Sequence, residues 1–137
     1  MTAELTPDTQ QLIETKSLAH FVTLMPDGSP QVTPVWVDHD GTHVLINTAE
    51  GRQKPKNLNL DKRVALSIAD HENPYRYVQI RGRVVEVTRE GARDHIEKMA
   101  RKYMGEQAQY PHREGEVRIL IKILPEHIEG RAARPRE

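Results

Sequence analysis

One stretch of the chain, residues 18–48, decides the fold, and it reads LAHFVTLMPDGSPQVTPVWVDHDGTHVLINT. Its first residues alternate between the two sides of an extended chain with a period of two, which indicates a β-strand. The segment Met25–Ser29 then supplies a proline and a glycine, both suited to a tight turn. A second turn follows at Asp38–Gly41. The stretch therefore predicts a three-stranded antiparallel meander. Its strands are expected over Leu18–Leu24, Gln31–Val37 and Thr42–Thr48.

Outside this stretch the sequence predicts three more strands and two or three helices. Thr6 and Pro7 suit the cap and the first position of a short helix that ends near Lys16. A longer amphipathic helix is expected over residues 89–104, capped by Thr88. A third, short helix is expected over Pro55–Leu60, and the strands over Val64–Ala69, Tyr77–Val87 and Val117–Leu124. We expect Gly82 to mark a bend or bulge, Pro125 to end the last strand, and residues 131–137 to form a frayed tail.

This order of elements predicts a mainly β (α+β) fold, a six-stranded antiparallel barrel that forms one domain over residues 1–137. The chain lacks the alternating strand–helix rhythm of a parallel nucleotide-binding sheet. With one Phe, one Trp and four Tyr, the core of so small a domain is thin. We therefore expect a second copy of the chain to cover part of its apolar surface.

The composition excludes several classes of function. Twenty basic and twenty acidic residues give no net charge, which argues against a protein that coats nucleic acid or an anionic membrane. The absence of cysteine excludes disulfides and thiolate chemistry. No apolar run approaches the roughly 20 residues of a membrane span, and the N-terminus does not read as a secretion signal, so we expect a cytoplasmic protein. The seven histidines lack metal-ligand spacing, so no metal site is predicted.

The segment 47–58, NTAEGRQKPKNL, is the strongest functional signal. A strand ends in small polar residues, Gly51 permits an irregular loop, and Arg52 and Lys54 follow just before a helix. In an extended chain these two side chains leave from the same side, and the amides at the start of the helix add further donors for an anion. The segment therefore suggests a phosphate site, although a solvated basic loop has the same composition. It matches neither the Walker motif nor GxGxxG.

The sequence motifs PDGSP, QVTPVWV, NTAEGRQKPKNL and RYVQIRGRV, in this order, resemble the pyridoxamine 5′-phosphate oxidase-like split β-barrel family over about residues 12–128. More narrowly, the chain is similar to the flavin/deazaflavin oxidoreductase branch of that family. The resemblance implies a homodimer that binds its cofactor at the subunit interface. The short chain and the Gly51–Lys54 loop favour the deazaflavin coenzyme F-420, with FMN as the alternative.

The resemblance also implies roles for individual residues. Arg52 and Lys54 would bind the cofactor phosphate, and Asn57 would cap the helix or support the phosphate loop, unless it is a plain surface residue. The ring of the cofactor would lie along Asn47 and Thr48, in a pocket lined by Gln31, Thr33 and Pro34. The other subunit would contribute Tyr75, Tyr77 and Gln79. No catalytic residue is assigned, because the chemistry belongs to the cofactor.

These inferences predict an F-420-dependent oxidoreductase that transfers hydride to a small organic substrate. An FMN-dependent oxidoreductase of the pyridoxamine phosphate oxidase type is the alternative. A non-catalytic dimer that binds a cofactor, haem or a small anion could use the same basic loop. An oligonucleotide-binding barrel is disfavoured, because the chain has no net positive charge and few aromatic residues.

Overall fold

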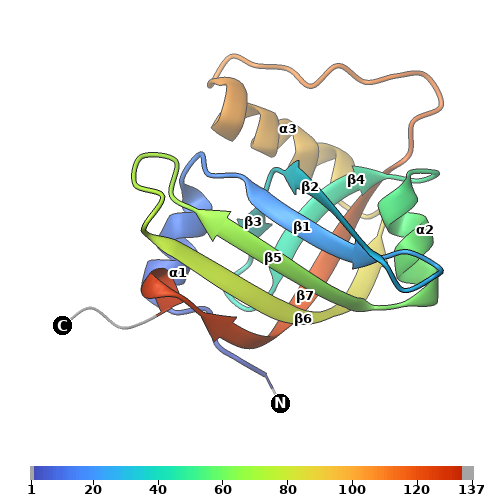
Figure 1. Ribbon diagram of the computed structural model, residues 1–137. Helices are drawn as coiled ribbons and strands as arrows, with labels where there is room; N and C mark the ends of the chain where they lie inside the picture. The colour runs from blue at the N-terminus through green and yellow to red at the C-terminus, as the bar shows by residue number, and fades with distance from the viewer. Residues whose placement is uncertain (1, 134–137) are drawn as a thin grey trace.

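The computed structural model describes residues 2–133, which form one curled antiparallel sheet with three α-helices (Figure 1). Neighbouring strands follow the order β2-β1-β5-β6-β7-β4-β3. The strands are β1 (Ala19–Leu24), β2 (Pro30–Val35), β3 (Asp38–His39), β4 (Val44–Ala49), β5 (Arg63–Ala69), β6 (Tyr77–Thr88) and β7 (Arg118–Glu129). The helices are α1 (Pro7–Glu14), α2 (Gln53–Leu60) and α3 (Ala92–Met104), followed by the short 3-10 helix η1 (Arg131–Ala133).

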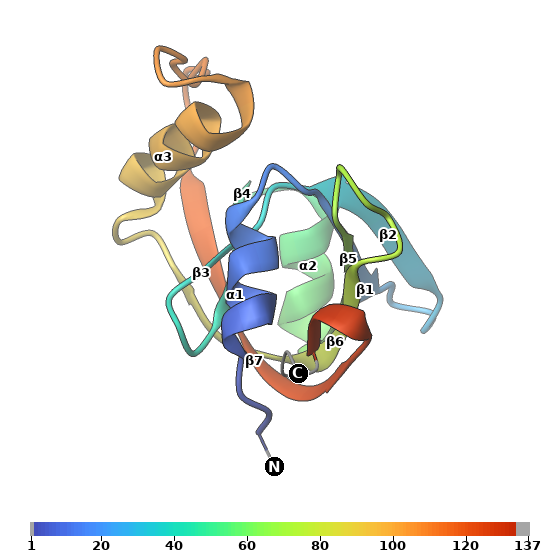
Figure 2. The ribbon, with the colours of Figure 1, turned by 90° about the vertical axis from the view of Figure 1, so that its left-hand side faces the viewer.

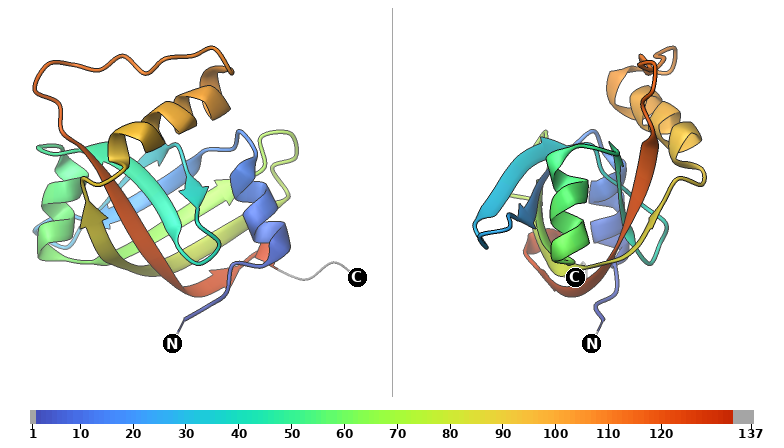
Figure 3. Two further views of the ribbon diagram at one scale, coloured as in Figure 1. Left: turned by 180° about the vertical axis from the view of Figure 1, so that it is seen from behind. Right: turned by 90° about the vertical axis from the view of Figure 1, so that its right-hand side faces the viewer.

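The sheet wraps around two of the helices and leaves the third outside. Seen end-on, α1 and α2 lie within the curl, whereas α3 lies outside it (Figure 2; Figure 3, right). The inner helices fill the core with Leu12, Ile13 and Leu58, which pack among strand residues such as Phe21. α3 contacts β4 and β7, where a smaller cluster joins Ala92 to Leu45 and Leu120.

The prediction of a mainly β, antiparallel fold is confirmed, but the predicted count of six strands is one too low. The additional strand is β3, whose residues Asp38 and His39 pair with Leu45 and Val44 of β4. The sequence pattern Asp38–Gly41 predicts a turn at this position. A two-residue strand is too short to show an alternating pattern, so periodicity does not reveal it.

The predicted meander is wrong at its second connection. β1 and β2 pair as expected, from Ala19↔Val35 to Leu24↔Pro30. β4, however, pairs with β7 and with the short β3, and lies at the other end of the sheet from β2. Hydrophobic alternation identifies a strand but not its neighbour, and the neighbour of β4 comes from a segment about 70 residues further along the chain.

Two predicted helix boundaries also need correction. α3 begins at Ala92, after Gly91 at φ 73°, rather than at Arg89 with Thr88 as its cap. The Thr88 hydroxyl instead accepts from the Glu90 amide at 3.1 Å and closes a turn before the helix. α2 begins at Gln53, two residues before the predicted start. By contrast, the Thr6 cap of α1 is confirmed, since its Oγ1 accepts from the Thr9 amide at 3.2 Å.

Strand β7 continues through Pro125, where the sequence predicted its end. The β6–β7 register shifts between Arg81 and Gly82, and Gly82 lies opposite Pro125 at this irregularity. A bulge is one of the few places in a sheet that accepts proline, because proline has no amide to donate. The predicted bulge at Gly82 is confirmed, and a Cβ there would lie 2.2 Å from the Leu124 carbonyl oxygen.

The predicted frayed tail is wrong for residues 131–133, which form η1. Thr9 Oγ1 donates to the Ala132 carbonyl at 2.7 Å, and Ala132 is buried against the core. Residues 134–137 lie outside the described part of the chain. Within the described part, no helix combines the length and the apolar character needed to cross a membrane.

Replacing Gly82 by alanine should destabilise the protein, because the new methyl group would overlap the Leu124 carbonyl. We expect the free energy of unfolding to fall by roughly 1–3 kcal/mol, the usual cost of overpacking. Urea denaturation followed by circular dichroism measures this change. Ser67→Ala, at an exposed position of the neighbouring strand β5, should stay within about 0.5 kcal/mol of the parent. Equal midpoints for Gly82→Ala and the parent would contradict the tight β6–β7 contact.

Candidate functional site

A pocket of about 280 Å³ lies between β2 and β4, beside the start of α2. β2 is the end strand of the sheet, with β1 as its only neighbour in the described sheet order, so its second edge faces the gap. Most of the residues predicted to bind a cofactor line this pocket. They are Gln31, Thr33 and Pro34 from β2, Asn47 and Thr48 from β4, and Arg52 and Lys54 at the start of α2.

Arg52 and Lys54 both line the pocket, but their cationic groups contact different partners. Arg52 is the N-cap residue of α2, and its Nη2 lies 3.8 Å from Oε2 of Glu116. Lys54 lies in the first turn of the helix, and its Nζ donates to Oγ1 of Thr33 on β2. The predicted convergence of the two side chains assumed an extended backbone. Because the helix already begins at Gln53, the backbone from Arg52 to Lys54 is not the extended one that this prediction required.

Lys54 lacks a carboxylate partner among residues 2–133, and the Thr33 hydroxyl that it contacts is neutral. Burial lowers the pKa of Lys54, which is the direction expected for an ammonium group that has lost part of its hydration. The start of α2 also has no side-chain capping hydrogen bond, so its first amides can donate to an anion. A partly desolvated cation and these amides together fit a phosphate group.

Asn47 is held by a buried polar network on the α3 side of β4, which the sequence analysis did not foresee. Its Nδ2 donates to the Ala92 carbonyl at 2.7 Å, and its Oδ1 accepts from Nε of Arg118 at 3.0 Å. The side chain of Asn47, which also lines the pocket, is therefore already hydrogen-bonded to α3 and β7.

Arg118 connects this network to the cation at the start of α2. Its side chain is 4% exposed, and its Nη1 donates to Oη of Tyr110 and to Oε1 of Glu116, both at 3.2 Å. The other Glu116 oxygen faces Arg52, so one carboxylate lies between two guanidinium groups. The only signal in the sequence was an arginine between the apolar residues Val117 and Ile119. The polar loop before that strand gave no indication that its glutamate was a partner.

Asp38 extends the network on its other side. His95 Nε2 donates to Asp38 Oδ2 at 3.0 Å, Lys98 Nζ donates to the same oxygen at 3.1 Å, and His95 Nδ1 lies 3.1 Å from Asn47 Nδ2. Burial opposes ionisation of Asp38. The hydrogen bonds, first of all that from His95, outweigh this effect and hold the pKa of the carboxyl well below its usual range.

Asn57, which was predicted to cap the helix, support the phosphate loop or lie on the surface, does not line the pocket. It is fully buried, and its Nδ2 donates to Oγ1 of Thr23 at 2.9 Å, while its Oδ1 accepts from Nε2 of Gln53 at 2.8 Å. These bonds tie α2 to β1, so the reading of Asn57 as a plain surface residue is wrong. Its contribution to the site is to hold the helix that carries Arg52 and Lys54.

Three further predicted residues lie outside the pocket. Tyr75 is 75% exposed in the loop before β6, and Tyr77 and Gln79 lie at exposed positions of β6, which β1 and β5 separate from β2. Their assignment to the site of another subunit stays a prediction. Trp36, the residue after β2, stacks on Tyr103 of α3 with ring centroids 5.3 Å apart and so packs against that helix.

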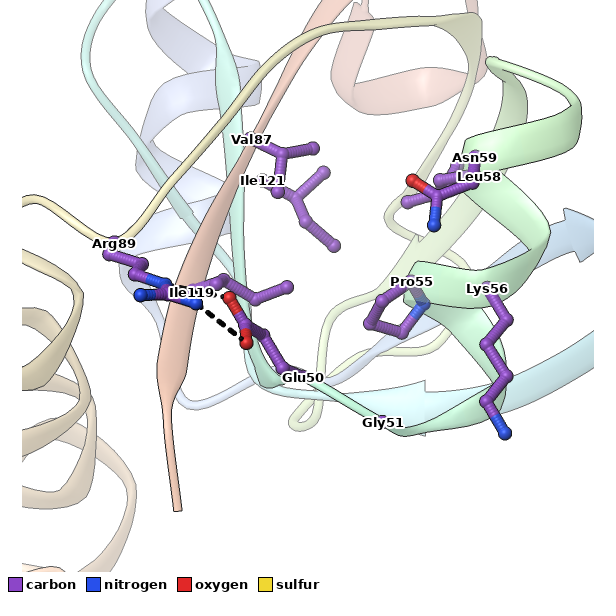
Figure 4. Close-up of a pocket in the computed structure, with 10 residues that line it drawn as sticks. All are labelled: Glu50, Gly51, Pro55, Lys56, Leu58, Asn59, Val87, Arg89, Ile119 and Ile121. Atoms are coloured by element: carbon purple, nitrogen blue, oxygen red, sulfur yellow. Dashed lines mark hydrogen bonds and ion pairs between the residues drawn. The ribbon is translucent and has the colours of Figure 1, made fainter. Parts of the chain in front are cut away.

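A larger pocket, of about 420 Å³, lies on the other side of α2 (Figure 4). Val87, Ile119 and Ile121 form its apolar wall. At one end, Arg89 donates two hydrogen bonds to Glu50, at 2.7 and 3.0 Å, and this contact raises the pKa of Arg89. The charges of Glu50 and Arg89 balance each other. Figure 4 shows that Lys56, the other cation at this pocket, is directed away from the apolar wall. The smaller pocket, with its uncompensated Lys54, is therefore the better candidate for an anionic ligand.

Within residues 2–133, no group of acidic or histidine side chains could hold a metal ion.

Comparisons with known proteins identify a family model and several solved structures to which the chain is similar. The family model described as pyridoxamine 5′-phosphate oxidase matches residues 5–131. Among solved structures, an F-420 reductase is 30% identical, with a TM-score of 0.78 over 88% of this chain and 94% of that one. A putative pyridoxamine 5′-phosphate oxidase from Listeria innocua is 18% identical, with a TM-score of 0.66 over 87% and 91% of the two chains, and this likeness shows the fold alone. No curated protein matches the chain.

Replacing Asp38 by asparagine should destabilise the protein by about 2 kcal/mol at neutral pH, because the depressed pKa of Asp38 reports stabilising contacts of its charged form. That stabilisation is complete above the pKa of an unfolded aspartate, about 3.9, and is lost as the pH falls below it. The difference in unfolding free energy between parent and Asp38→Asn should therefore shrink between about pH 5 and pH 2.

Urea titrations at several pH values measure this difference. Glu90→Gln, at an exposed position before α3, is the control and should lie within about 0.5 kcal/mol of the parent throughout. A parent–variant difference that stayed constant down to pH 2 would show that the Asp38 charge is not what His95 and Lys98 stabilise.

Proposed function

Because the chain belongs to the pyridoxamine 5′-phosphate oxidase family, we propose that it is an oxidoreductase that binds the deazaflavin coenzyme F-420 in the pocket between β2 and β4. The observation that carries the proposal is the partly buried Lys54, which faces this pocket beside Arg52 without a carboxylate partner among the described residues. The likeness to an F-420 reductase at 30% identity favours the deazaflavin over FMN.

Each part of the pocket has a distinct task in this proposal. Lys54, Arg52 and the first amides of α2 bind the phosphate. Gln31 and Thr33 of β2 contribute polar side chains at the rim of the ring site, and the backbone of β4 borders its other side. When bound, reduced F-420 supplies a hydride to a small organic substrate. The protein holds the cofactor in place, presents one face of it to the substrate and limits the access of water.

We also propose that two copies of the chain share each site. The volume of about 280 Å³ lies at the lower limit for small-molecule sites, so a tricyclic cofactor needs a further wall. Tyr75, Tyr77 and Gln79 lie at exposed positions, where they can supply such a wall to a second subunit.

Fluorescence titration of the purified protein with F-420, and separately with FMN, tests the proposal. We expect F-420 to bind more tightly than FMN. Failure of both cofactors to bind at tens of micromolar would exclude the proposed function, and tighter binding of FMN would move the protein to the flavin branch. Oxidation of reduced F-420 in the presence of candidate acceptors then separates a reductase from a protein that only carries the cofactor.

Lys54→Met should weaken F-420 binding by about 10- to 100-fold, because a hydrogen bond to a charged group contributes about 1.5–3 kcal/mol. Lys56→Met is the matched control, since this exposed lysine two residues further along does not line the pocket. It should change the dissociation constant by less than about threefold. Equal effects of the two substitutions would mean that the phosphate binds elsewhere.

Light scattering at working concentration should give a mass of twice the 15.7 kDa chain. A monomeric mass for the cofactor-loaded protein would contradict a site shared between two copies.

A further inference from the structure

Glu116 places a fixed negative charge beside the cations of the candidate phosphate site. Arg52 and Lys54 line the pocket, and the carboxylate of Glu116 lies between Arg52 and the buried Arg118. Its side chain is 10% exposed, and both of its oxygens face guanidinium groups, at 3.2 and 3.8 Å. A ligand that binds Arg52 therefore meets this carboxylate as well as the cations.

Several contacts keep the carboxylate in this position. Arg118, its closer partner, is itself held by Oδ1 of Asn47 and by Oη of Tyr110, and its guanidinium lies 5.0 Å from the centre of the Tyr110 ring. The backbone is also fixed, because the Glu50 amide donates to the Val117 carbonyl at 2.9 Å and Arg118 pairs with Ala49. Moving Glu116 away from Arg52 would leave the buried Arg118 without its carboxylate, which is costly.

A fixed charge affects ligands in proportion to their own charge, since the Coulomb energy is the product of the two charges. A phosphodiester such as that of F-420 carries one negative charge. A phosphate monoester such as that of FMN carries about 1.5 to 2 negative charges at pH 7. The same carboxylate therefore opposes the monoester up to twice as strongly as the diester.

We propose that Glu116 is a specificity-determining residue, which selects against phosphate monoesters and in favour of phosphodiesters at the Arg52–Lys54 site. The inference rests on the proposed function, because it requires the cofactor phosphate to bind beside Arg52. It adds a reason why a site with two cations should prefer the cofactor whose phosphate carries the smaller negative charge. Lys54 attracts both ligands, and Glu116 reduces the advantage that a second negative charge would otherwise bring.

The test is the affinity of Glu116→Gln for FMN and F-420, with riboflavin as the phosphate-free reference. Glutamine keeps an oxygen that can accept from Arg118 and removes only the charge. We expect F-420 to bind about 3-fold more tightly, FMN about 10-fold more tightly and riboflavin with unchanged affinity, because the gain scales with the charge on the phosphate group beside Arg52. Glu114→Gln, an exposed carboxylate in the same loop, should leave all three affinities within about twofold.

Each outcome of this test decides the inference. Weaker binding of both cofactors to Glu116→Gln would mean that Glu116 orients Arg52 instead, and equal gains for FMN and F-420 would also overturn the proposal. If the parent and Glu116→Gln bind neither cofactor, the proposed function fails and the inference fails with it. If both cofactors bind the parent and Glu116→Gln behaves like Glu114→Gln, only the inference fails.

A second variant keeps the test decisive if Glu116→Gln does not fold. Glu116→Asp retains the charge that Arg118 requires but shortens the side chain by one methylene group, which draws the carboxylate back from Arg52. We expect a smaller gain in the same order, FMN above F-420. A ratio of FMN to F-420 affinity equal to that of the parent would contradict the proposal.

Discussion

The gap between β2 and β4 is the constraint on which the rest of this structure depends. The sheet ends in β2 on one side and in the two-residue β3, beside β4, on the other, and β2 keeps one edge without a strand neighbour in the described sheet. Pro30 and Pro34 suit that edge, because they lack the amide donors that a further strand would require. The contact of Lys54 with Thr33 then joins α2 to β2 and places a cation at the gap. An open seam in the sheet thus becomes a pocket lined by polar groups.

The cations at this seam depend on residues from distant parts of the chain. Asn57 fixes α2 from inside the curl through Thr23, and Glu116 contacts Arg52 from the loop before β7. On the outer side of β4, one polar network runs from Asp38 through Asn47 to Arg118. Because its members are buried and hydrogen-bonded to one another, the network gives the charges beside the pocket defined positions.

The two pockets beside α2 show that size alone does not identify a binding site. The larger pocket ends in the Glu50–Arg89 pair, whose charges cancel, whereas the smaller one contains a desolvated lysine. A buried charge without a partner is unfavourable in the empty protein and becomes favourable when an anion binds. Electrostatics is therefore the reason why the smaller pocket is proposed as the anion site. Glu116, beside Arg52 of this pocket, is in turn proposed to distinguish between anions of different charge.

The sequence by itself determined the features that depend on neighbouring residues. Alternation located the longer strands, Thr6 marked the start of α1, and the Gly51–Lys54 segment indicated the loop that lines the pocket. These signals are local because turns, caps and side-chain alternation depend on residues only a few positions apart. The resemblance of motifs to a known family added the residues of β2 and β4 that the pocket brings together.

Only the tertiary structure decided which segments meet. The pairing of β4 with β7, the passage of β7 through Pro125 and the burial of Asn57 all depend on contacts between segments far apart in the chain. The same holds for Glu116, which lies in the loop before β7 and which the fold brings between Arg118 and Arg52. Strand partners and ion pairs are chosen by the packing of the whole chain, so no local pattern of residue types specifies them.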